Sequence, residues 1–364
     1  MQSLSSREKQ ELQFETVLVL QGGGSLGAYE CGVYKALHKH GIKFDIVAGT
    51  SIGAVNASII SGSKDDDPAK ALEDFWLDLA EGVTPPGFSD EIRPYFASTY
   101  SAVFGNPKAF FPKWFFPSAD YFMPYSWQYL YDITPLKQTL NQYIDWEKIQ
   151  KPQSPRLIIT STDIQNAKPS VFDSKYDKIE ADHVLASAGY PFYGISWTQK
   201  SGKYLWDGTL LSNTPLREVI NASPKHDKKV YVVDLFPKDH PEIPNNMFEV
   251  WHRARDIIQT DKTEHNIRMS KIVTRYLRLI REMHDILGSS KLDDEAKSRL
   301  AILEKEYQKL ASERGGIIDK IISIQRHEHF HFLFEDADFS IATIRELIDN
   351  GERDAKEALA KDAQ

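Results

Sequence analysis

The chain has 364 residues, of which 41% are hydrophobic and 26% are charged, and its formal net charge is -8. This composition is that of a globular protein with one large domain or two, and it excludes a disordered chain, a collagen and a disulfide scaffold. The single cysteine, Cys31, rules out an intrachain disulfide and fits a reducing compartment. The acidic balance argues against nucleic acid as a partner, because phosphate binding requires clustered Lys and Arg.

No uncharged apolar run approaches the roughly 18 residues that a membrane span requires. The first 16 residues are polar and charged, so we expect no signal peptide. These features predict a cytoplasmic protein, and any membrane contact would be peripheral.

Before residue 240, short apolar runs alternate with segments of helical period. We expect strands over residues 16–20, 44–48, 156–162 and 229–236, and helices over residues 27–40 and 52–61. The strands are almost continuously apolar, as in sheets that are covered on both faces. Residues 16–240 are therefore predicted to form an α/β layered domain with a mostly parallel central sheet.

A glycine-rich turn, residues 22–27 (GGGSLG), follows the first predicted strand. Glycines let the backbone approach a ligand closely, and free N–H groups at the start of a helix favour an anion. That anion is either the pyrophosphate of a dinucleotide or the oxyanion that forms during acyl transfer. A purely structural turn is the third interpretation.

The second predicted strand leads into a sequence of the type G-x-S-x-G, with Gly49, Ser51 and Gly53. A nucleophile elbow requires this position between strand and helix, because its tight turn exposes the serine hydroxyl between small neighbours. The alternative is a glycine-rich turn with a helix-capping serine. The context favours Ser51 as a nucleophile.

Residues 88–131 hold 16 of the 42 aromatic residues of the chain, together with five prolines that interrupt any long helix. We expect a compact, irregular, aromatic-rich insertion. Its rings either pack on the main domain or form a hydrophobic lid or acyl-chain channel, since aromatic side chains bring a large apolar area with few rotamers to freeze.

Asp207 and Gly208 follow the short apolar run at residues 204–206. An acidic residue at the carboxyl end of a strand points into the crevice where α/β sheets bind ligands. Taken alone, however, the Asp-Gly pair is more typical of a turn.

Residues 241–364 contain 44 charged residues and only two of the 18 prolines. This pattern predicts a mainly helical C-terminal extension. Apolar residues recur at helical spacing in residues 273–287 and again in residues 300–310, which predicts an antiparallel hairpin with one apolar stripe. We expect the stripe to pack on its own domain, and a homodimer interface is the alternative.

The combination of these motifs resembles the patatin-like phospholipase family. The resemblance rests on the glycine-rich turn, the serine elbow and the later Asp-Gly pair, and it covers about residues 16–217. Gly32, residues 53–57 (GAVNA) and residues 186–192 (ASAGYPF) agree with it. It implies a serine lipid acyl hydrolase or carboxylesterase that acts on a lipid or another ester and needs no cofactor and no metal.

The resemblance also implies roles for individual residues. Ser51 would attack an ester carbonyl, and Asp207 would act as its base in a Ser-Asp dyad. The backbone N–H groups of Gly22, Gly23 and Gly24 would form the oxyanion hole, and water would then hydrolyse the acyl-enzyme. Four further glycines would let the turns around this site close: Gly27, Gly49, Gly53 and Gly208.

The chain departs from the family pattern at two positions. The family usually has Arg or Lys where this chain has Leu26, and often Gly or Ala where it has Thr209. Leu26 leaves the backbone donors intact but removes a positive charge near the anion site. The tail from about residue 245, with residues 338–340 (DFS) and Gly351, resembles an extension of some bacterial members.

Three other functions use the same motifs. A Ser-His-Asp α/β-hydrolase would need a histidine after the acid, and the candidates are His327, His329 and His331. Residues 325–334 alternate like a strand, which favours a structural role for these histidines. A dinucleotide-dependent oxidoreductase would need an acid near Asp45, but Asp45 begins its predicted strand instead of ending it. The third alternative is a relative without catalysis that binds a lipid or a partner.

Membrane contact would rely on exposed aromatic rings, because the negative charge provides no attraction to anionic lipid. The sequence leaves the head group and the acyl-chain length of the substrate open, as well as the choice between hydrolysis and acyl transfer.

Overall fold

The computed structural model describes residues 14–81, 83, 93–115, 123, 126–222, 227–239, 243–290, 292–314, 318–327 and 335–362. Parts of three predictions lie outside these residues. They are the segments 88–92, 116–122 and 124–125 of the aromatic insertion, residues 328–334 of the strand expected over residues 325–334, and His329 and His331 among the candidate histidines.

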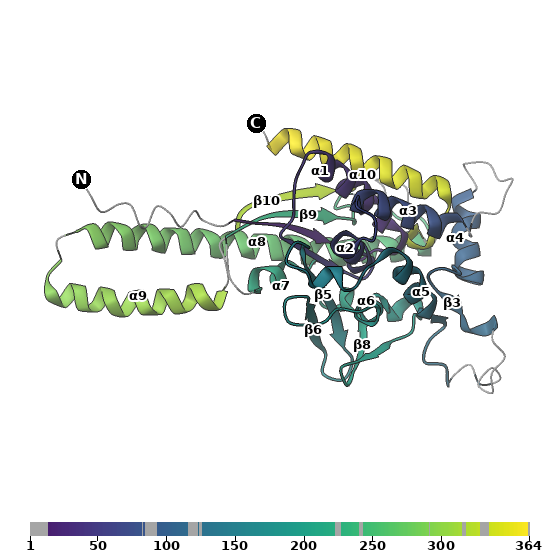
Figure 1. Cartoon of the computed structure of the whole chain (residues 1–364), viewed down its shortest axis with the longest axis horizontal. Helices are drawn as coiled ribbons and strands as arrows, with labels where there is room; N and C mark the ends of the chain where they lie inside the picture. The colour runs from purple at the N-terminus through teal and green to yellow at the C-terminus, as the bar shows by residue number, and fades with distance from the viewer. Residues whose placement is uncertain are drawn as a thin grey trace.

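Within the described residues, eight strands form the central sheet, in the order β10-β9-β1-β2-β5-β8-β7 with β6 paired to β5 (Figure 1). The strands are β1 (Glu15–Leu20), β2 (Ile46–Thr50), β5 (Arg156–Asp163), β6 (Lys168–Asp173), β7 (Thr198–Lys200), β8 (Lys203–Asp207), β9 (Lys228–Asp234) and β10 (Ile318–Gln325). The pairings from β10 to β5 are parallel, and those that β5 and β8 make on the other side are antiparallel. The predicted α/β class with a mostly parallel central sheet is confirmed.

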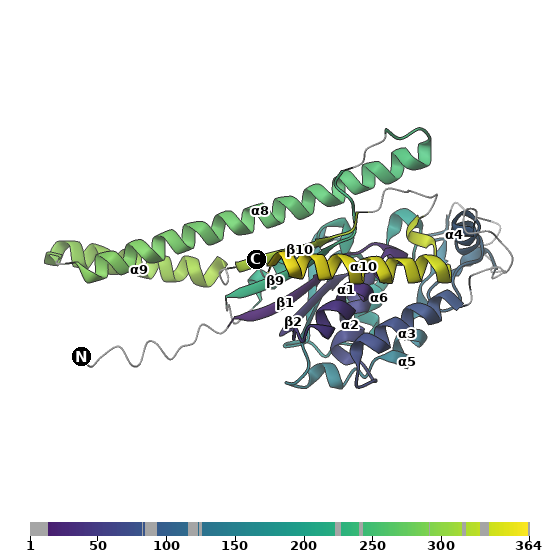
Figure 2. The same ribbon diagram turned by 90° about the horizontal axis from the view of Figure 1, so that it is seen from above.

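Helices cover both faces of this sheet (Figure 2). The helices of the described residues are α1 (Gly27–Lys39), α2 (Ile52–Gly62), α3 (Pro68–Glu81), α4 (Arg93–Phe104), α5 (Thr134–Tyr143), α6 (Ala181–Ala188), α7 (Leu216–Asn221), α8 (Met247–Ser289), α9 (Asp294–Arg314) and α10 (Ile341–Asp362). Short 3-10 turns include η1 (Gly24–Leu26), η2 (Lys113–Phe115), η6 (Pro191–Tyr193), η7 (Gly208–Leu210) and η8 (Glu335–Ala337).

The side chains of β1 divide between two hydrophobic cores. Leu18 and Leu20 join the core that includes residues of α1, α2, α3 and α10, whereas Val17 and Val19 join a second core with residues of α7 and α8. Successive side chains of a strand point to opposite faces, so a continuously apolar strand fills both cores. This three-layer arrangement aligns the carboxyl ends of β1 and β2 at one edge of the sheet.

The structure corrects the predicted strands at two places. The second strand is β2 (Ile46–Thr50), two residues later than expected, because Ile46 is the first residue in register with both β1 and β5. The strand expected over residues 325–334 is wrong at Arg326 and His327, which follow the end of β10. β10 itself was not predicted, because its parallel partner β9 is far away in the sequence.

The C-terminal region takes part in the main fold. β10 extends the central sheet, and α10 packs against α1. At this contact a Cβ on Gly32 would lie 1.9 Å from the carbonyl oxygen of Ile348, and a Cβ on Gly351 would lie 2.1 Å from that of Tyr29. The two helices therefore approach backbone to backbone through a glycine on each of them. The boundary near residue 240 stays a prediction.

Helices α8 and α9 form the predicted antiparallel hairpin, which projects from the layered body (Figures 1 and 2). The expectation that its apolar stripe packs on its own domain is wrong for most of the stripe. Tyr276 is 62% exposed, Met283 53%, Ile302 67% and Leu303 63%. Leu277, which is not part of the predicted stripe, is buried.

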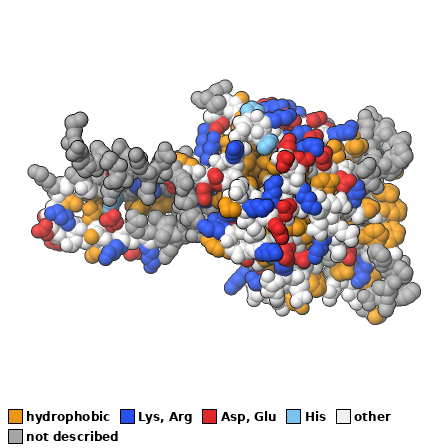
Figure 3. Space-filling view, in the orientation of Figure 1, with side chains coloured by type: hydrophobic (Ala, Val, Ile, Leu, Met, Phe, Trp, Pro, Cys, Tyr) orange, Lys and Arg blue, Asp and Glu red, His pale blue; other side chains and the backbone are white. Residues whose placement is uncertain are grey.

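In the described part of the aromatic insertion, some rings pack against one another and others lie at the surface, and its role as a lid or channel stays a prediction. It consists of α4, β3 (Phe111–Pro112), η2 and β4 (Tyr131–Asp132), and Phe110 and Tyr131 meet edge to face at 5.4 Å on the inside. Other side chains point outward, including Phe96 and Phe104, which are nearly half exposed. Figure 3 shows hydrophobic side chains gathered at this end of the molecule.

Candidate active site

Ser51 lies on a sharp turn between β2 and α2. Its backbone has φ 56° and ψ -124°, a left-handed value of φ that is costly for any residue with a side chain. The flanking glycines make the turn sterically possible, because a Cβ on Gly49 would lie 2.1 Å from the carbonyl oxygen of Gly53, and one on Gly53 would lie 2.5 Å from that of Leu20. This is the geometry expected of a nucleophile elbow.

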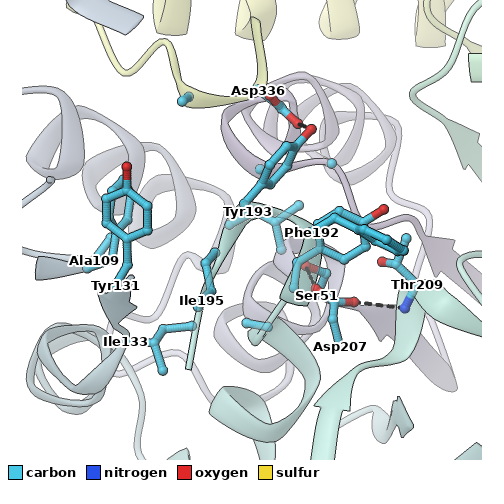
Figure 4. Close-up of a pocket in the computed structure, with 18 of the residues that line it drawn as sticks. Ser51, Ala109, Tyr131, Ile133, Phe192, Tyr193, Ile195, Asp207, Thr209 and Asp336 are labelled. Atoms are coloured by element: carbon cyan, nitrogen blue, oxygen red, sulfur yellow. Dashed lines mark hydrogen bonds between the residues drawn. The ribbon is translucent and has the colours of Figure 1, made fainter. Parts of the chain in front are cut away.

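Ser51 and Asp207 meet although 156 positions separate them. The Ser51 hydroxyl donates a hydrogen bond of 2.6 Å to Oδ2 of Asp207 (Figure 4). Asp207 is the last residue of β8, and Gly208 lets the next turn pass β5, since a Cβ there would lie 2.4 Å from the carbonyl oxygen of Thr160. The pairing of β8 with β5 thus carries the carboxylate to the elbow.

Asp207 is buried, and burial raises its pKa from 3.8 to about 6. The hydrogen bonds from the Ser51 hydroxyl and from the backbone N–H of Thr209 (2.8 Å to Oδ1) favour the ionised form and offset part of this effect. The carboxylate therefore has a proton affinity close to that needed for proton transfer near neutral pH.

The glycine-rich turn lies beside the elbow. Gly22, Gly23 and Gly24 line the same cavity as Ser51 and Asp207. The N–H group of Gly22 donates a hydrogen bond of 2.9 Å to Oδ1 of Asn213. It would have to break this bond before it could donate to a ligand in the cavity. Gly24 has φ +59°, which glycine adopts without strain.

Gly27 lets α1 begin close to α2. A Cβ on Gly27 would lie 2.6 Å from Cγ1 of Ile52, the residue that follows the serine. The glycine-rich turn and the elbow therefore keep a fixed separation, which a larger side chain at this position would increase.

The buried carboxyl group of Glu30 is hydrogen-bonded to the residue that precedes the glycine-rich turn. Glu30 accepts hydrogen bonds from the backbone N–H of Gln21 (2.7 Å) and from the side-chain amide of Asn56 (2.8 Å). Its burial raises its pKa well above the usual range. Asn56 belongs to the segment after the serine and also contacts Gly27, so this network couples α1 to α2.

Three further residues, Ser187, Thr209 and Asn213, hold the reacting region in place, and the sequence pattern predicted no role for them. The Ser51 N–H donates to the hydroxyl of Ser187 (2.8 Å), which in turn donates to the carbonyl of Thr160. The hydroxyl of Thr209 donates to Asn213, the partner of Gly22. Ser187 belongs to the motif at residues 186–192, whereas Asn213 carried no sequence signal.

The site opens into a cavity of about 400 Å³. Its walls are mostly apolar and come from distant parts of the chain: Ile52, Val55, Leu79, Ala109, Phe110, Leu130, Tyr131, Ile133, Leu136 and Ile195. Ala109, Tyr131 and Ile133 lie together on one side of the cavity in Figure 4, and Tyr193 and Asp336 lie away from them. An apolar cavity that reaches Ser51 has the size and lining that suit an acyl chain.

The cavity gives no support to the alternative sites. None of the described residues that line it is a histidine, and His327 borders a separate hollow beside β10. Asp45 accepts a hydrogen bond from the N–H of Thr16, so it lies at the amino end of β1, opposite the glycine-rich turn. Among the described residues, no group of three His, Cys, Asp or Glu could hold a metal ion.

The backbone at Ser51, between a parallel strand and a helix, has the geometry of the elbow that carries the nucleophile in one class of α/β proteins. Within that class, a model of the patatin-like phospholipase family matches residues 18–220, more than half of the chain. The chain belongs to the patatin-like phospholipase family.

Shorter segments match curated relatives. Lysophospholipase nte1 of Aspergillus terreus is 49% identical over 51 residues, which are 14% of this chain and 3% of that protein. Lysophospholipase NTE1 of Meyerozyma guilliermondii is 62% identical over 78 residues, 19% of this chain and 5% of that protein. Patatin-like phospholipase domain-containing protein ZK370.4 of Caenorhabditis elegans is 42% identical over 60 residues, which are 16% of this chain and 4% of that protein. The chain thus spans a small part of these relatives.

Solved structures with distant similarity include VipD of Legionella pneumophila, with a TM-score of 0.40 and 14% identity over 96% of this chain and 67% of that one. The type III effector protein ExoU has a TM-score of 0.36 and 11% identity over 96% of this chain and 53% of the other.

Proposed function

We propose that the protein is a serine lipid acyl hydrolase, or carboxylesterase, with a Ser51-Asp207 dyad. The observation that carries the proposal is the 2.6 Å hydrogen bond from the Ser51 hydroxyl to a buried carboxylate, at the end of an apolar cavity. Family membership supports the same reaction, and the printed names of two relatives describe lysophospholipases.

In the proposed mechanism, Oγ of Ser51 attacks the ester carbonyl carbon while its proton passes to Asp207. The carbonyl oxygen becomes an oxyanion, which the backbone N–H groups of Gly23 and Gly24 in the glycine-rich turn would bind. Gly22 would contribute only after releasing Asn213. When the tetrahedral intermediate collapses, Asp207 returns the proton to the departing alcohol, and the acyl group stays on Ser51.

Deacylation reverses these roles. Asp207 takes a proton from a water molecule, whose oxygen attacks the acyl-enzyme, and Ser51 regains its proton as the carboxylic acid leaves. None of these steps needs a metal or a cofactor. An acceptor alcohol in place of water would turn the same chemistry into acyl transfer.

The test is hydrolysis of p-nitrophenyl esters of graded chain length, combined with fluorophosphonate labelling. We expect the wild-type protein to be labelled on Ser51, and Ser51→Ala and Asp207→Asn to lose at least about a thousandfold in kcat. Ser298→Ala, a change on the projecting hairpin, is the matched control and should keep full activity. Unchanged hydrolysis in Ser51→Ala would disprove the mechanism, and a protein that is neither labelled nor active would be a binding relative.

Peripheral membrane contact through the exposed part of the aromatic insertion extends this proposal. Phe96, Val103, Phe104 and Phe115 are each more than 40% exposed, and their neighbours Ala102 and Leu130 line the cavity. An apolar surface beside the cavity mouth would let a lipid pass from the bilayer to Ser51. Helices in the described part of the chain are too short or too polar to span a membrane. Sedimentation with neutral vesicles should fall in Phe104→Ser.

A homodimer through the hairpin stripe is the second extension. The exposed side chains of Tyr276, Met283 and Leu303 support it, because apolar residues at helical spacing usually meet a partner. Light scattering of the wild-type protein should give twice the monomer mass, and the Met283→Glu variant should give the monomer mass. A wild-type monomer at micromolar concentration would refute the dimer.

A further inference from the structure

A cluster of charged side chains includes two residues that line the cavity, Arg255 and Asp336, and Asp336 lies away from the apolar residues Ala109, Tyr131 and Ile133 (Figure 4). Arg255 of α8 donates hydrogen bonds to two carboxylates, through Nε (3.1 Å) and Nη2 (2.9 Å) to Asp256 and through Nη1 (3.1 Å) to Asp336. The hydroxyl of Tyr193 donates to the same carboxylate oxygen of Asp336 at 2.5 Å (Figure 4). The three charged side chains are at least nine-tenths buried.

This cluster adjoins the reacting groups. A Cβ on Gly24 would lie 2.2 Å from the backbone carbonyl oxygen of Asp336, so η8 packs directly on the glycine-rich turn. Tyr190 connects the two parts of the site: its ring centroid lies 5.1 Å from that of Tyr193, and the N–H of Asp207 donates a hydrogen bond of 3.0 Å to the carbonyl of the preceding residue, Gly189. An ester held at Ser51 with its acyl chain along the apolar wall would direct its alcohol part toward this cluster.

Acidic side chains outnumber basic ones along the described lining of the cavity, where Asp207 and Asp336 are the acidic residues. Arg255 is the only basic residue among the described residues that line the cavity, and it is shared by two carboxylates. Leu26, which stands where the family usually has a basic residue, is buried and does not line the cavity. The described cavity therefore offers no cation that lacks a carboxylate partner.

We propose that the Arg255-Asp256-Asp336 cluster selects substrates by charge: the site takes esters whose alcohol part has no net negative charge, and it rejects anionic head groups. This inference rests on the proposed hydrolase function and assigns a specificity role to residues outside the matched region 18–220. The physical reason is that like charges repel strongly in a buried site, where little water screens them.

The experiment compares two substrates with the same acyl chain, a neutral monoacylglycerol and an anionic lysophosphatidic acid, in detergent micelles. The measured quantity is the ratio of their kcat/KM values, neutral over anionic. We expect a ratio of at least about tenfold for the wild-type protein. Asp336→Asn keeps a hydrogen-bonding side chain but removes one negative charge, so the ratio should fall several-fold toward one.

Two further variants separate the charge effect from a folding defect. Arg255→Gln removes the cation and should change the ratio in the opposite direction, whereas a merely structural defect would lower both kcat/KM values together. Asp285→Asn removes the same charge from a 76% exposed position on α8 and should leave the ratio unchanged. Melting temperatures identify any variant that is not folded.

The outcomes are distinct. A wild-type ratio near one, or a ratio that Asp336→Asn and Arg255→Gln leave unchanged, overturns the charge selection while the hydrolase function stands. A wild-type protein that hydrolyses neither substrate and is not labelled on Ser51 overturns the proposed function, and the selection with it.

Discussion

At the scale of a single residue, the burial of Asp207 has two opposing effects on its proposed role as a base. Burial raises its pKa to about 6, which makes the carboxylate a better base than an exposed aspartate. The same burial disfavours the ionised form that the proposed mechanism needs. Hydrogen bonds from Ser51 and Thr209 keep the pKa low enough for Asp207 to be mostly ionised at neutral pH.

The first prediction concerns the pH dependence of acylation. Because only ionised Asp207 can accept the serine proton, kcat/KM should rise with pH to a plateau, with a midpoint near pH 6. The measurement is kcat/KM for a neutral ester between pH 4.5 and 8.5. Asp234 is a useful control, since its buried carboxyl has a pKa raised to about 7 but does not contact Ser51. Asp234→Asn should keep the midpoint, and a flat wild-type profile would contradict the role of Asp207.

The second prediction concerns stability. The pKa of Asp207 is higher in the folded protein than in the unfolded chain, so its stabilising contribution is complete below about pH 4 and is lost as the pH rises through 6. The loss corresponds to at most about 3 kcal/mol. Asp207→Asn should therefore melt at a higher temperature than wild type at pH 8 and at a similar temperature at pH 4.

Thermal unfolding at both pH values measures this difference. Asp285→Asn, at an exposed position, should show no such pH-dependent gain. A destabilised Asp207→Asn at pH 8 would mean that the hydrogen bonds of the carboxylate outweigh its desolvation.

At the scale of secondary-structure elements, the contact between α1 and α10 depends on two glycines. Gly351→Ala would place a methyl group 2.1 Å from the carbonyl oxygen of Tyr29, so the helices must separate. We expect a loss of about 1–3 kcal/mol in the free energy of unfolding, measured by urea denaturation. Gly288→Ala, where a Cβ would meet nothing within 4 Å, is the matched control and should gain up to about 1 kcal/mol. Equal stability of Gly351→Ala and wild type would contradict the close contact.

At the scale of the whole molecule, the region after residue 240 has two parts with different roles. β10 and α10 belong to the central layers, whereas the distal hairpin projects from them (Figure 1). The N–H of Ile318 donates a hydrogen bond of 3.2 Å to the hydroxyl of Thr274 in the middle of α8. After the hairpin, the chain therefore returns to the level of Thr274 and enters β10.

This arrangement predicts opposite results for two deletions. Replacing residues 279–312 with a short Gly/Ser linker should preserve folding, and hydrolysis should stay within about twofold of wild type. Truncation after residue 240 should abolish folding, because it exposes the edge of β9 and the face of α1 that α10 covers. Circular dichroism and ester hydrolysis test both. An active truncated protein would show that residues 16–240 form an independent domain.

The amino-acid sequence by itself determined the elements around the reacting groups. The elbow at Ser51 and the glycine-rich turn follow from local sterics, since their glycines lie within a few positions of the residues they accommodate. The apolar strands also follow from a local pattern. For this reason the α/β class and the family could be recognised before the structure.

Tertiary structure alone decided which distant residues complete the cavity. Asn213 reaches the site from the loop after η7, and Arg255 reaches it from α8. β10 forms a strand because it pairs in parallel with β9. No local pattern encodes such pairings, since their free energy comes from surfaces that meet only after the chain has folded. The apolar stripe of α8 illustrates the same limit: its period predicted a helix, and only the fold decided that most of it would stay exposed.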